Sequence, residues 1–522
     1  MSLARNVATV GSATLISRLL AYTRDAGIAA LLGTSPYSEA LFAVFQLVNF
    51  FRRLLAEGAL NGAFVPIWLK MRAGGDGSAD ADRFTRRCLL AMLSVTGILA
   101  LLAVALAPFV IATIAPGFDE SRNVLASYLL IIVAFYVVLA GLAAVLAAAL
   151  NAEGRVAAPA FSTAAFNMVM VAVVSLALSI DVPSLEIALW LSGAVVAAGF
   201  VQLVIALAAW LASGSRWRAA HQRVNDSTGT MFKRALPGLI AGGAPQLKLI
   251  AATAIVSSSP AAVSWLYYAN RLYELPLGVA SIATAAVIVP RIAATMHASD
   301  RSAYADAQSR AYEITVGLAL PAAAAFALLA PQIAGGLFEH GAFGAADTEA
   351  VAIALIAICS GLPGHALEKV FAAVSFAHED TRTPMHAALA GVAAAVIAGV
   401  GLFPLFGYIG AVAAVAMSAW VGALVLALVL YRRGWLRLDA EAAWRLPRIV
   451  LASMVMGAGI SIGLVVDHVF FPMLEASAVG RLAVLFVLVG VGLAVYAAAL
   501  QTLGVVKLAD VVAAIRRAET LA

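Results

Sequence analysis

The sequence predicts an all-α polytopic membrane protein with about 14 transmembrane helices, arranged as two six-helix parallel repeats followed by two C-terminal helices. Composition, the length of the apolar runs and an internal repeat predict this fold. Of 522 residues, 63% are hydrophobic and 12% are charged, and the mean hydropathy is +0.98. Such a chain has too few polar residues to cover a soluble core, so we expect it to lie in a bilayer.

The apolar runs have the length that membrane-spanning helices need. A helix of about 20 residues crosses the ~30 Å hydrocarbon core of a bilayer, and most of the runs are near this length. The expected spans are 5–32, 37–70, 86–115, 122–150, 158–179, 186–212, 232–257, 262–290, 311–337, 348–376, 384–405, 408–431, 447–466 and 479–503. We expect the first to be a retained helix, because MSLARN begins no cleavable signal pattern.

Basic residues gather in alternate loops, and this asymmetry predicts the orientation of the chain. Lys and Arg collect on the cytoplasmic side of membrane proteins. One set of loops holds Lys70, Arg72, Arg83, Arg86, Arg87, Arg155, Arg216, Arg218, Arg223, Arg291, Arg301, Arg382, Arg432, Arg433 and Arg437. The other set has essentially only Arg122. Both termini are therefore expected in the cytoplasm, and loops facing anionic lipid explain the net charge of +5 without nucleic acid.

Three pairs of short motifs recur at an offset of about 224 residues, which indicates an internal repeat. The pairs are LLGTSPYSEALF and IVSSSPAAVSWLY, FVPIW and IVPRI, and ALNAEGRVAAP and SFAHEDTRTP. The expected domains are an N-terminal repeat (1–212), a cytoplasmic linker (213–229), a C-terminal repeat (230–433), and two further helices with an amphipathic cytoplasmic tail (434–522). An even number of helices per repeat relates the halves by an axis along the membrane normal, and transporters of this kind bind substrate between the halves.

Polar and charged side chains form stripes along several apolar helices, because each residue turns 100° about the helix axis. The stripes are Gly11, Thr14, Arg18, Tyr22 and Asp25 in the first helix, Glu39, Gln46, Asn49, Arg53 and Glu57 in the second, and Tyr267, Arg271, Glu274 and Gly278 in the eighth. Arg24 lies about a third of a turn from the first stripe. Lys248 occupies the repeat position of Arg24, and His365, Glu368 and Lys369 cluster in the tenth helix.

The arginines of these helices must face a hydrated or protein-lined interior, because each would cost about 2.5 to 3.5 kcal/mol at the bilayer centre. Two interpretations stay open. In the first they are structural, and pair as Arg53 with Glu57, Arg271 with Glu274, and Arg18 with Asp25. In the second, arginines that outnumber the nearby acids bind a ligand bearing phosphate or carboxylate through their planar donor forks.

Four segments, SRLLAYTRDAGIAALLG, FFRRLLAEGALNGAFVP, YYANRLYELPLGV and EDTRTP, resemble the MurJ (MviN) family of lipid II flippases, within the multidrug/oligosaccharidyl-lipid/polysaccharide exporter superfamily. The resemblance covers nearly the whole chain. It implies a non-enzymatic flippase of the bacterial inner membrane that moves undecaprenyl-pyrophosphate-linked peptidoglycan precursor, lipid II, to the outer leaflet by alternating access. It also implies that the extra helices, roughly 447–503, line a hydrophobic groove for the polyprenyl tail, and that lipid II and membrane lipids are the partners.

The residues expected to bind substrate are Arg18, Arg24, Arg52, Arg53, Arg271, Glu57 and Glu39. Candidate cavity or gating residues are Asp25, Asn49, Lys248, Asn270, Glu274, Glu368 and Lys369. The chain departs from the family pattern at Glu39, which is often Asp, and at Asn270, where some relatives carry Asp. Release of the substrate is expected to involve Glu57 or Glu39 competing for the arginines.

Other functions are weighed against this one. An exporter of another lipid-linked oligosaccharide stays open, whereas a cation-coupled drug exporter of the superfamily should show unpaired acids in its cavity instead of arginines. A scaffold would need larger loops, although cell-wall synthesis proteins remain candidate partners. Asp80 and Asp82 have the D-x-D spacing of metal-dependent glycosyltransferases, but we interpret them as part of a solvated loop. No G-x-x-x-x-G-K-[ST] occurs, so ATP is not expected to bind in the usual phosphate cradle, and a gradient, the membrane potential or precursor flux must supply energy. H-E-x-x-H and C-x-x-C are also absent, and no cofactor or metal is expected.

Overall fold

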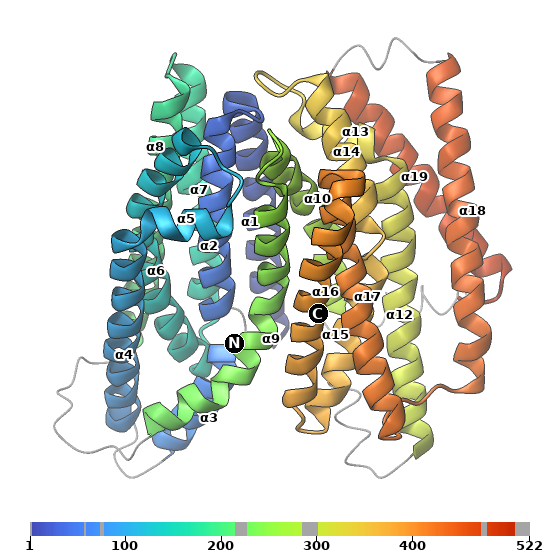
Figure 1. The fold of residues 1–522 in the computed structure, drawn as a ribbon. Coiled ribbons are helices and arrows are strands. Elements are labelled where there is room, and N and C mark those ends of the chain that lie inside the picture. The colour runs from blue at the N-terminus through green and yellow to red at the C-terminus, as the bar shows by residue number, and fades with distance from the viewer. Residues whose placement is uncertain are drawn as a thin grey trace. The chain divides into compact units, whose positions relative to one another are not determined.

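The protein is helical throughout the part that the computed structural model describes (Figure 1). That part comprises residues 3–56, 59–73, 78–214, 227–283, 301–470 and 478–506, and it contains no strand. The predicted all-α polytopic membrane fold is confirmed. The expected amphipathic tail, residues 215–226 of the expected linker and the second Val-Pro motif near 290 lie outside the described residues.

The chain forms two compact units. Unit 1 comprises Met1–Ser264 with His340–Phe343, and unit 2 comprises Trp265–Glu339 with Gly344–Ala522. Helix α9 (Ser227–Val256) is by sequence the first helix of the second repeat, but it packs against α2 (Pro36–Ala56) and therefore belongs to unit 1. Packing thus divides the chain at a different place from the expected domain boundary at 213–229.

The remaining helices of unit 1 are α1 (Leu3–Leu32), α3 (Ala59–Arg72), α4 (Ser78–Ala105), α5 (Ala107–Ile114), α6 (Glu120–Ala152), α7 (Ala157–Ser179) and α8 (Ser184–Ala212). Those of unit 2 are α10 (Ala262–Ala283), whose first turn lies in unit 1, α12 (Arg301–Leu328), α13 (Ala330–Phe338), α14 (Ala345–Cys359), α15 (Leu362–Ala377), α16 (Arg382–Phe406), α17 (Tyr408–Arg432), α18 (Ala440–Phe470) and α19 (Ala478–Thr502).

Helix boundaries repeat at the offset of the sequence motifs. Helix α1 ends at Leu32 and α9 at Val256, which are 224 residues apart. Helix α8 begins at Ser184 and α17 at Tyr408, which are again 224 residues apart. The internal repeat is therefore expressed in secondary structure as well as in sequence.

Two expected single spans, 86–115 and 311–337, are each divided in the structure. Leu106 separates α4 from α5, and Leu329 separates α12 from α13. In both places a proline, Pro108 or Pro331, stands within the first two residues of the new helix. Proline cannot donate the helical hydrogen bond to the preceding turn, but it fits a helix start.

Two further expected spans are also divided. The run expected at 348–376 consists of α14 and α15, and Pro363 lies at the start of α15. The run expected at 37–70 consists of α2 and α3, on either side of residues 57–58, which lie outside the described part.

Ten described segments are long and apolar enough to cross a membrane. Helices α1, α2, α9 and α10 are not among them although they have 30, 21, 30 and 22 residues. Helices α1, α2 and α10 carry the charged stripes, which lower their hydropathy, and α9 carries Lys248. Ten apolar segments and four charged helices together correspond to the expected 14.

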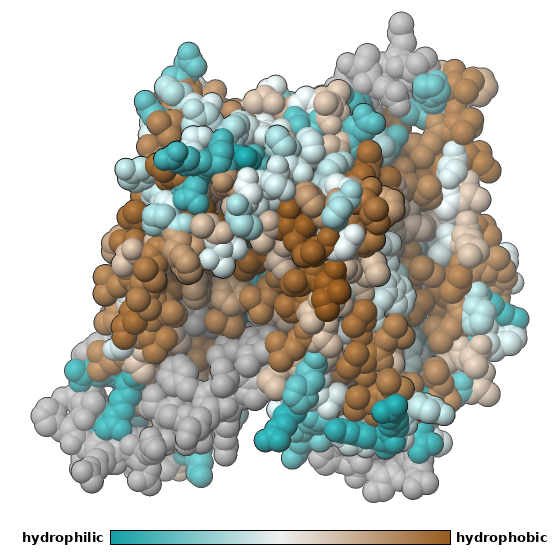
Figure 2. Space-filling view, viewed as in Figure 1, coloured by the Kyte–Doolittle hydropathy of each residue, from teal (hydrophilic) through white to brown (hydrophobic). Residues whose placement is uncertain are grey.

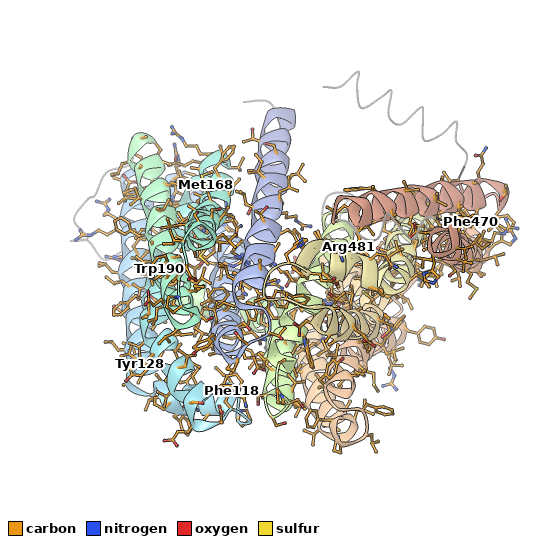
Figure 3. All side chains as sticks on the ribbon, turned by 90° about the horizontal axis from the view of Figure 1, so that it is seen from above. Phe118, Tyr128, Met168, Trp190, Phe470 and Arg481 are labelled. Atoms are coloured by element: carbon orange, nitrogen blue, oxygen red, sulfur yellow. The ribbon has the colours of Figure 1, made fainter. Side chains whose placement is uncertain are left out.

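Apolar side chains cover the surfaces that face lipid in such a protein. Figure 2 shows apolar residues over α4 in unit 1 and over α18 in unit 2, with hydrophilic residues gathered near the beginning of α6 and the end of α17. Individual exposures agree: Phe109 on α5 is 72% exposed, Phe486 on α19 is 74% exposed, and Phe470 at the end of α18, labelled in Figure 3, is 71% exposed.

An ion pair connects the start of α19 to the turn between α13 and α14. Arg481, labelled in Figure 3 at the start of α19, donates from Nη1 to Oε1 of Glu339 at 2.9 Å. The other carboxylate oxygen of Glu339 accepts from the hydroxyl of Thr348 at 2.8 Å. Both oxygens of this carboxylate thus accept a hydrogen bond, and α19 is tied to the rest of unit 2 at this end.

Candidate functional site

The predicted site residues lie in both units, and each set is described separately. Unit 1 holds Arg18, Arg24, Asp25, Glu39, Asn49, Arg52, Arg53 and Lys248, and unit 2 holds Asn270, Arg271, Glu274, Glu368 and Lys369. Glu57 and its expected pairing with Arg53 lie outside the described residues.

In α1, Arg24 is held by a buried polar network. Its Nε and Nη2 donate to Oδ1 of Asp25 at 2.8 and 2.6 Å, and its Nη1 donates to Oδ1 of Asn167 on α7 at 3.1 Å. Asn167 in turn donates to the hydroxyl of Ser17 at 3.0 Å. Arg24 is 7% exposed and Asp25 is fully buried. The expectation that Asp25 pairs with Arg18 is therefore wrong, because the long Arg24 side chain reaches its neighbouring residue.

The surroundings of the Arg18 and Arg52 side chains differ from those of Arg24. Both are half-buried, and in the described part of the chain no carboxylate lies within ion-pair distance of either guanidinium. A buried or partly buried cation without a counter-ion is costly unless water or a ligand solvates it. Unit 1 therefore presents cationic side chains that an anion can neutralise.

Arg53 is held by a residue that the stripe analysis did not identify. Gln246 on α9, 3% exposed, accepts hydrogen bonds through its amide oxygen from Nε and Nη1 of Arg53 at 3.1 and 3.0 Å. Two turns away, Gln46 on α2 donates to the hydroxyl of Thr253 on α9 at 2.5 Å. Neutral amides such as Gln246 and Asn167 give no charge signal, and only the packing of distant segments reveals them.

Glu39 lies away from the arginines of its own helix. Its Oε2 accepts from Nη1 of Arg122 on α6 at 2.9 Å, and Arg122 also donates from Nε to Oδ1 of Asp119 at 2.9 Å. Glu39 is 2% exposed, and it precedes Arg53 by four turns of α2, or about 21 Å of rise. In this structure Glu39 is therefore the counter-ion of Arg122 and cannot compete for Arg52 or Arg53.

The other predicted residues of unit 1 lie on the same two helices. Lys248 is 3% exposed on α9, two residues beyond Gln246. Asn49 is half-buried on α2, between the contacts of Gln46 and Arg53.

In unit 2, Arg271 and Glu274 form the expected pair within α10. Nη1 of Arg271 lies 3.2 Å from Oε2 of Glu274, and the amide of Asn270 donates to Oε1 of the same carboxylate at 3.4 Å. Both charged side chains stay about one-fifth exposed, at 19% and 22%. Asn270 therefore takes a role beside Glu274 although it carries no charge itself.

A second polar group of unit 2 lies where α15 meets α10 and α17. The hydroxyl of Tyr273 and Nδ1 of His365 are 3.1 Å apart and form a hydrogen bond. One turn along α15, the carboxylate of Glu368 packs on Gly422, where an added Cβ would lie 2.5 Å from Oε1. Lys369 follows on the same helix and is half-buried. Any side chain larger than glycine at position 422 would displace Glu368.

The D-x-D acids lie in a helix instead of the solvated loop that we expected. Asp80 is in the first turn of α4 and pairs with Arg83 at 2.6 Å, while Asp82 is 6% exposed. Within the described residues, no group of three or more His, Cys, Asp or Glu side chains could hold a metal ion.

These observations define a class of protein: a polytopic helical membrane transporter whose charged helices carry basic side chains inside the fold. The fold is shared with a solved multidrug transporter of the MATE family in an inward-facing conformation, at a TM-score of 0.66 and 13% identity over 80% of this chain and 94% of that chain. The chain belongs to the lipid II flippase MurJ family, whose family model matches residues 28–479.

Individual relatives agree with this assignment. The "Probable lipid II flippase MurJ" of Rhizobium meliloti (strain 1021) is 36% identical over 521 residues, which are 99% of this chain and 97% of that protein. A solved structure of a lipid II flippase MurJ in an inward closed conformation has a TM-score of 0.77 and 21% identity, covering 94% of this chain and 98% of that chain.

Proposed function

We propose that this protein is a flippase that moves lipid II from the inner to the outer leaflet of the bacterial inner membrane by alternating access. The observation that carries the proposal is the presence of half-buried Arg18 and Arg52, without carboxylate partners in the described part, in a chain of the MurJ family. A pyrophosphate headgroup cannot cross hydrocarbon unaided, and guanidinium groups replace its hydration with charge-assisted hydrogen bonds.

The arginines then divide into two roles. Arg18, Arg52, Arg53 and Arg271 bind the anionic headgroup, whereas Arg24 is held by Asp25 and Asn167 and shapes the site. Glu57 remains the candidate that competes for Arg53 during release, because Glu39 is the counter-ion of Arg122. A Glu57→Gln variant with unchanged turnover would remove that role from the mechanism.

The polyprenyl tail is proposed to stay in an apolar environment along α18 and α19. Apolar residues of these helices are widely exposed, among them Ile462 at 65%, Val465 at 63% and Leu493 at 63%. The tail therefore never has to leave hydrocarbon, and only the headgroup needs the polar path. Both termini are proposed to lie in the cytoplasm, as the loop charges predict. Cell-wall synthesis proteins remain candidate partners.

The proposal is tested by the accessibility of lipid II at the outer leaflet of cells that have been depleted of their own flippase and supplied with this protein. An Arg271→Ala copy expressed at the same level is the comparison. Restored accessibility with the wild type, and none with the variant, is expected. If the inserted wild type restores nothing, the substrate is another lipid-linked glycan, which is the alternative function. If both copies restore accessibility, Arg271 is structural.

A further inference from the structure

Helices α2 and α9 of unit 1 meet along an interface of polar contacts. Gln46 contacts Thr253, and Arg53, seven residues later, contacts Gln246, seven residues earlier on the other helix. The two helices are therefore antiparallel, and the contacts recur every two turns. The helices also approach closely just beyond the second contact, because a Cβ on Gly243 would lie 3.3 Å from Cδ1 of Leu54.

The two polar contacts of this interface differ in chemistry. The first joins two neutral side chains, since the amide nitrogen of Gln46 donates to the hydroxyl of Thr253. The second joins a neutral amide to a cation. A guanidinium group can only donate hydrogen bonds, so the atom of Gln246 that faces Nε and Nη1 of Arg53 must be its amide oxygen. Gln246 thus holds the Nε and Nη1 edge of Arg53 and adds no charge of its own.

We propose that Gln246 is a positioning residue for Arg53 in headgroup binding, an inference that rests on the proposed function. A guanidinium is planar and its donors form a rigid fork. Fixing the Nε and Nη1 edge therefore fixes the plane of the group and the direction of its remaining N–H bonds. A carboxylate in place of Gln246 would hold the same edge but cancel the charge that attracts a pyrophosphate. A neutral acceptor meets both needs, and its burial at 3% exposure keeps water from replacing it.

The inference is tested with the purified full-length protein in detergent, by measuring the Kd for lipid II. Gln246→Met removes the acceptor and keeps the length of the side chain. The matched control is Gln46→Met, which removes the other buried amide of the same interface. We expect the Kd to rise about fivefold to tenfold for Gln246→Met, the effect of one misplaced charge-assisted hydrogen bond, and to stay within about twofold for Gln46→Met.

A double-mutant cycle separates positioning from packing. If Gln246 acts through Arg53, the double variant Gln246→Met/Arg53→Met has the same Kd as Arg53→Met alone. Effects that multiply, or equal effects of Gln246→Met and Gln46→Met, overturn the inference. Gln246→Glu serves as a second variant in case the methionine does not fold. It keeps an acceptor and adds a negative charge, so its Kd should rise, and an unchanged Kd overturns the inference. Failure of the wild type to bind lipid II overturns the proposed function as well.

Discussion

The hydroxyl of Tyr496 on α19 donates a hydrogen bond to the carbonyl of Gly317 on α12 at 2.8 Å. Pro321 lies four residues after Gly317 within α12 and has no N–H to offer this carbonyl. Tyr496 therefore supplies the partner that the helix itself lacks. Since hydrocarbon offers no replacement, the contact ties α19 to α12.

Removing this hydroxyl should destabilise the fold without changing its charge. Tyr496→Phe is expected to lower the free energy of unfolding by about 1 to 3 kcal/mol, because the Gly317 carbonyl is left without a partner. The measurement is thermal or denaturant unfolding in detergent. Tyr128→Phe is the control, since Tyr128 is 63% exposed on α6. Equally small losses of unfolding free energy in both variants would show that the hydrogen bond from Tyr496 to Gly317 does not stabilise the fold.

Removing the charge of Arg24 should lower stability, whereas removing the charge of Arg18 should weaken binding of lipid II. Arg24→Gln removes the guanidinium that pairs with the fully buried Asp25, which is expected to cost about 3 to 5 kcal/mol of stability. Arg18→Gln is expected to leave stability nearly unchanged and to weaken lipid II binding. The yield of monodisperse protein, its unfolding temperature and the Kd distinguish the two. An Arg24→Gln protein as stable as wild type would contradict the network described for α1 and α7.

Replacing Glu39 or Arg122 should lower the stability of the protein but leave its affinity for the headgroup unchanged. The two side chains are 2% and 13% exposed, so the variants Glu39→Gln and Arg122→Gln should show a coupling energy of about 1 to 3 kcal/mol in a double-mutant cycle of unfolding. The Kd for lipid II should stay within about twofold of wild type in each single variant. A large loss of affinity in Glu39→Gln would restore Glu39 to the binding site.

Asp380 lies in the loop between α15 and α16, and its hydrogen bonds should make the stability of the protein depend on pH. Burial alone would raise the pKa of this carboxyl, but hydrogen bonds from the side chain and amide of Thr383, from Arg433 and from the amide of Arg382 outweigh it and lower the pKa from 3.8 to about 2. The hydroxyl and amide of Thr383 lie 2.5 and 3.0 Å from the carboxylate. A lowered pKa stabilises the folded protein above the unfolded value, and this contribution is lost as the pH falls from about 4 to 2.

The measurement is the unfolding temperature of the wild type and of Asp380→Asn between pH 7 and pH 2. The variant should be less stable at pH 7 by about 2 kcal/mol, and the difference should vanish near pH 2. Curves that stay parallel over this range would show that the hydrogen bonds to Asp380 do not favour its charged form.

The sequence predicted those parts of the fold that depend on local pattern. The lengths of the apolar runs predicted the spanning helices, and the motif offset of 224 residues separates the ends of α1 and α9. The breaks at Leu106 and Leu329 were not predicted, because hydropathy continues across them. Pro108 and Pro331 carried the signal, since a proline at this spacing starts a new helix.

The site was predicted less completely, because its contacts join segments far apart in the chain. The pair Arg271 and Glu274 was correct, as one turn of a helix brings such residues together. By contrast, Arg24 and Asn167 are 143 residues apart, and Glu39 and Arg122 are 83 residues apart. A stripe analysis identifies charged faces of single helices. It cannot say which neighbour, charged or neutral, each face meets.

The central claim is that Arg18 and Arg52, which have no carboxylate partner among the described residues, bind the lipid II headgroup. The most direct test is the Kd for lipid II of purified wild type, of Arg52→Gln and of Arg72→Gln. Arg72 is the control, because its side chain is 49% exposed and pairs with Glu153 at the surface. We predict that Arg52→Gln raises the Kd about tenfold or more, the effect of losing one charge-assisted contact to phosphate, and that Arg72→Gln leaves it within about twofold. Equal Kd values for Arg52→Gln and wild type would contradict the claim.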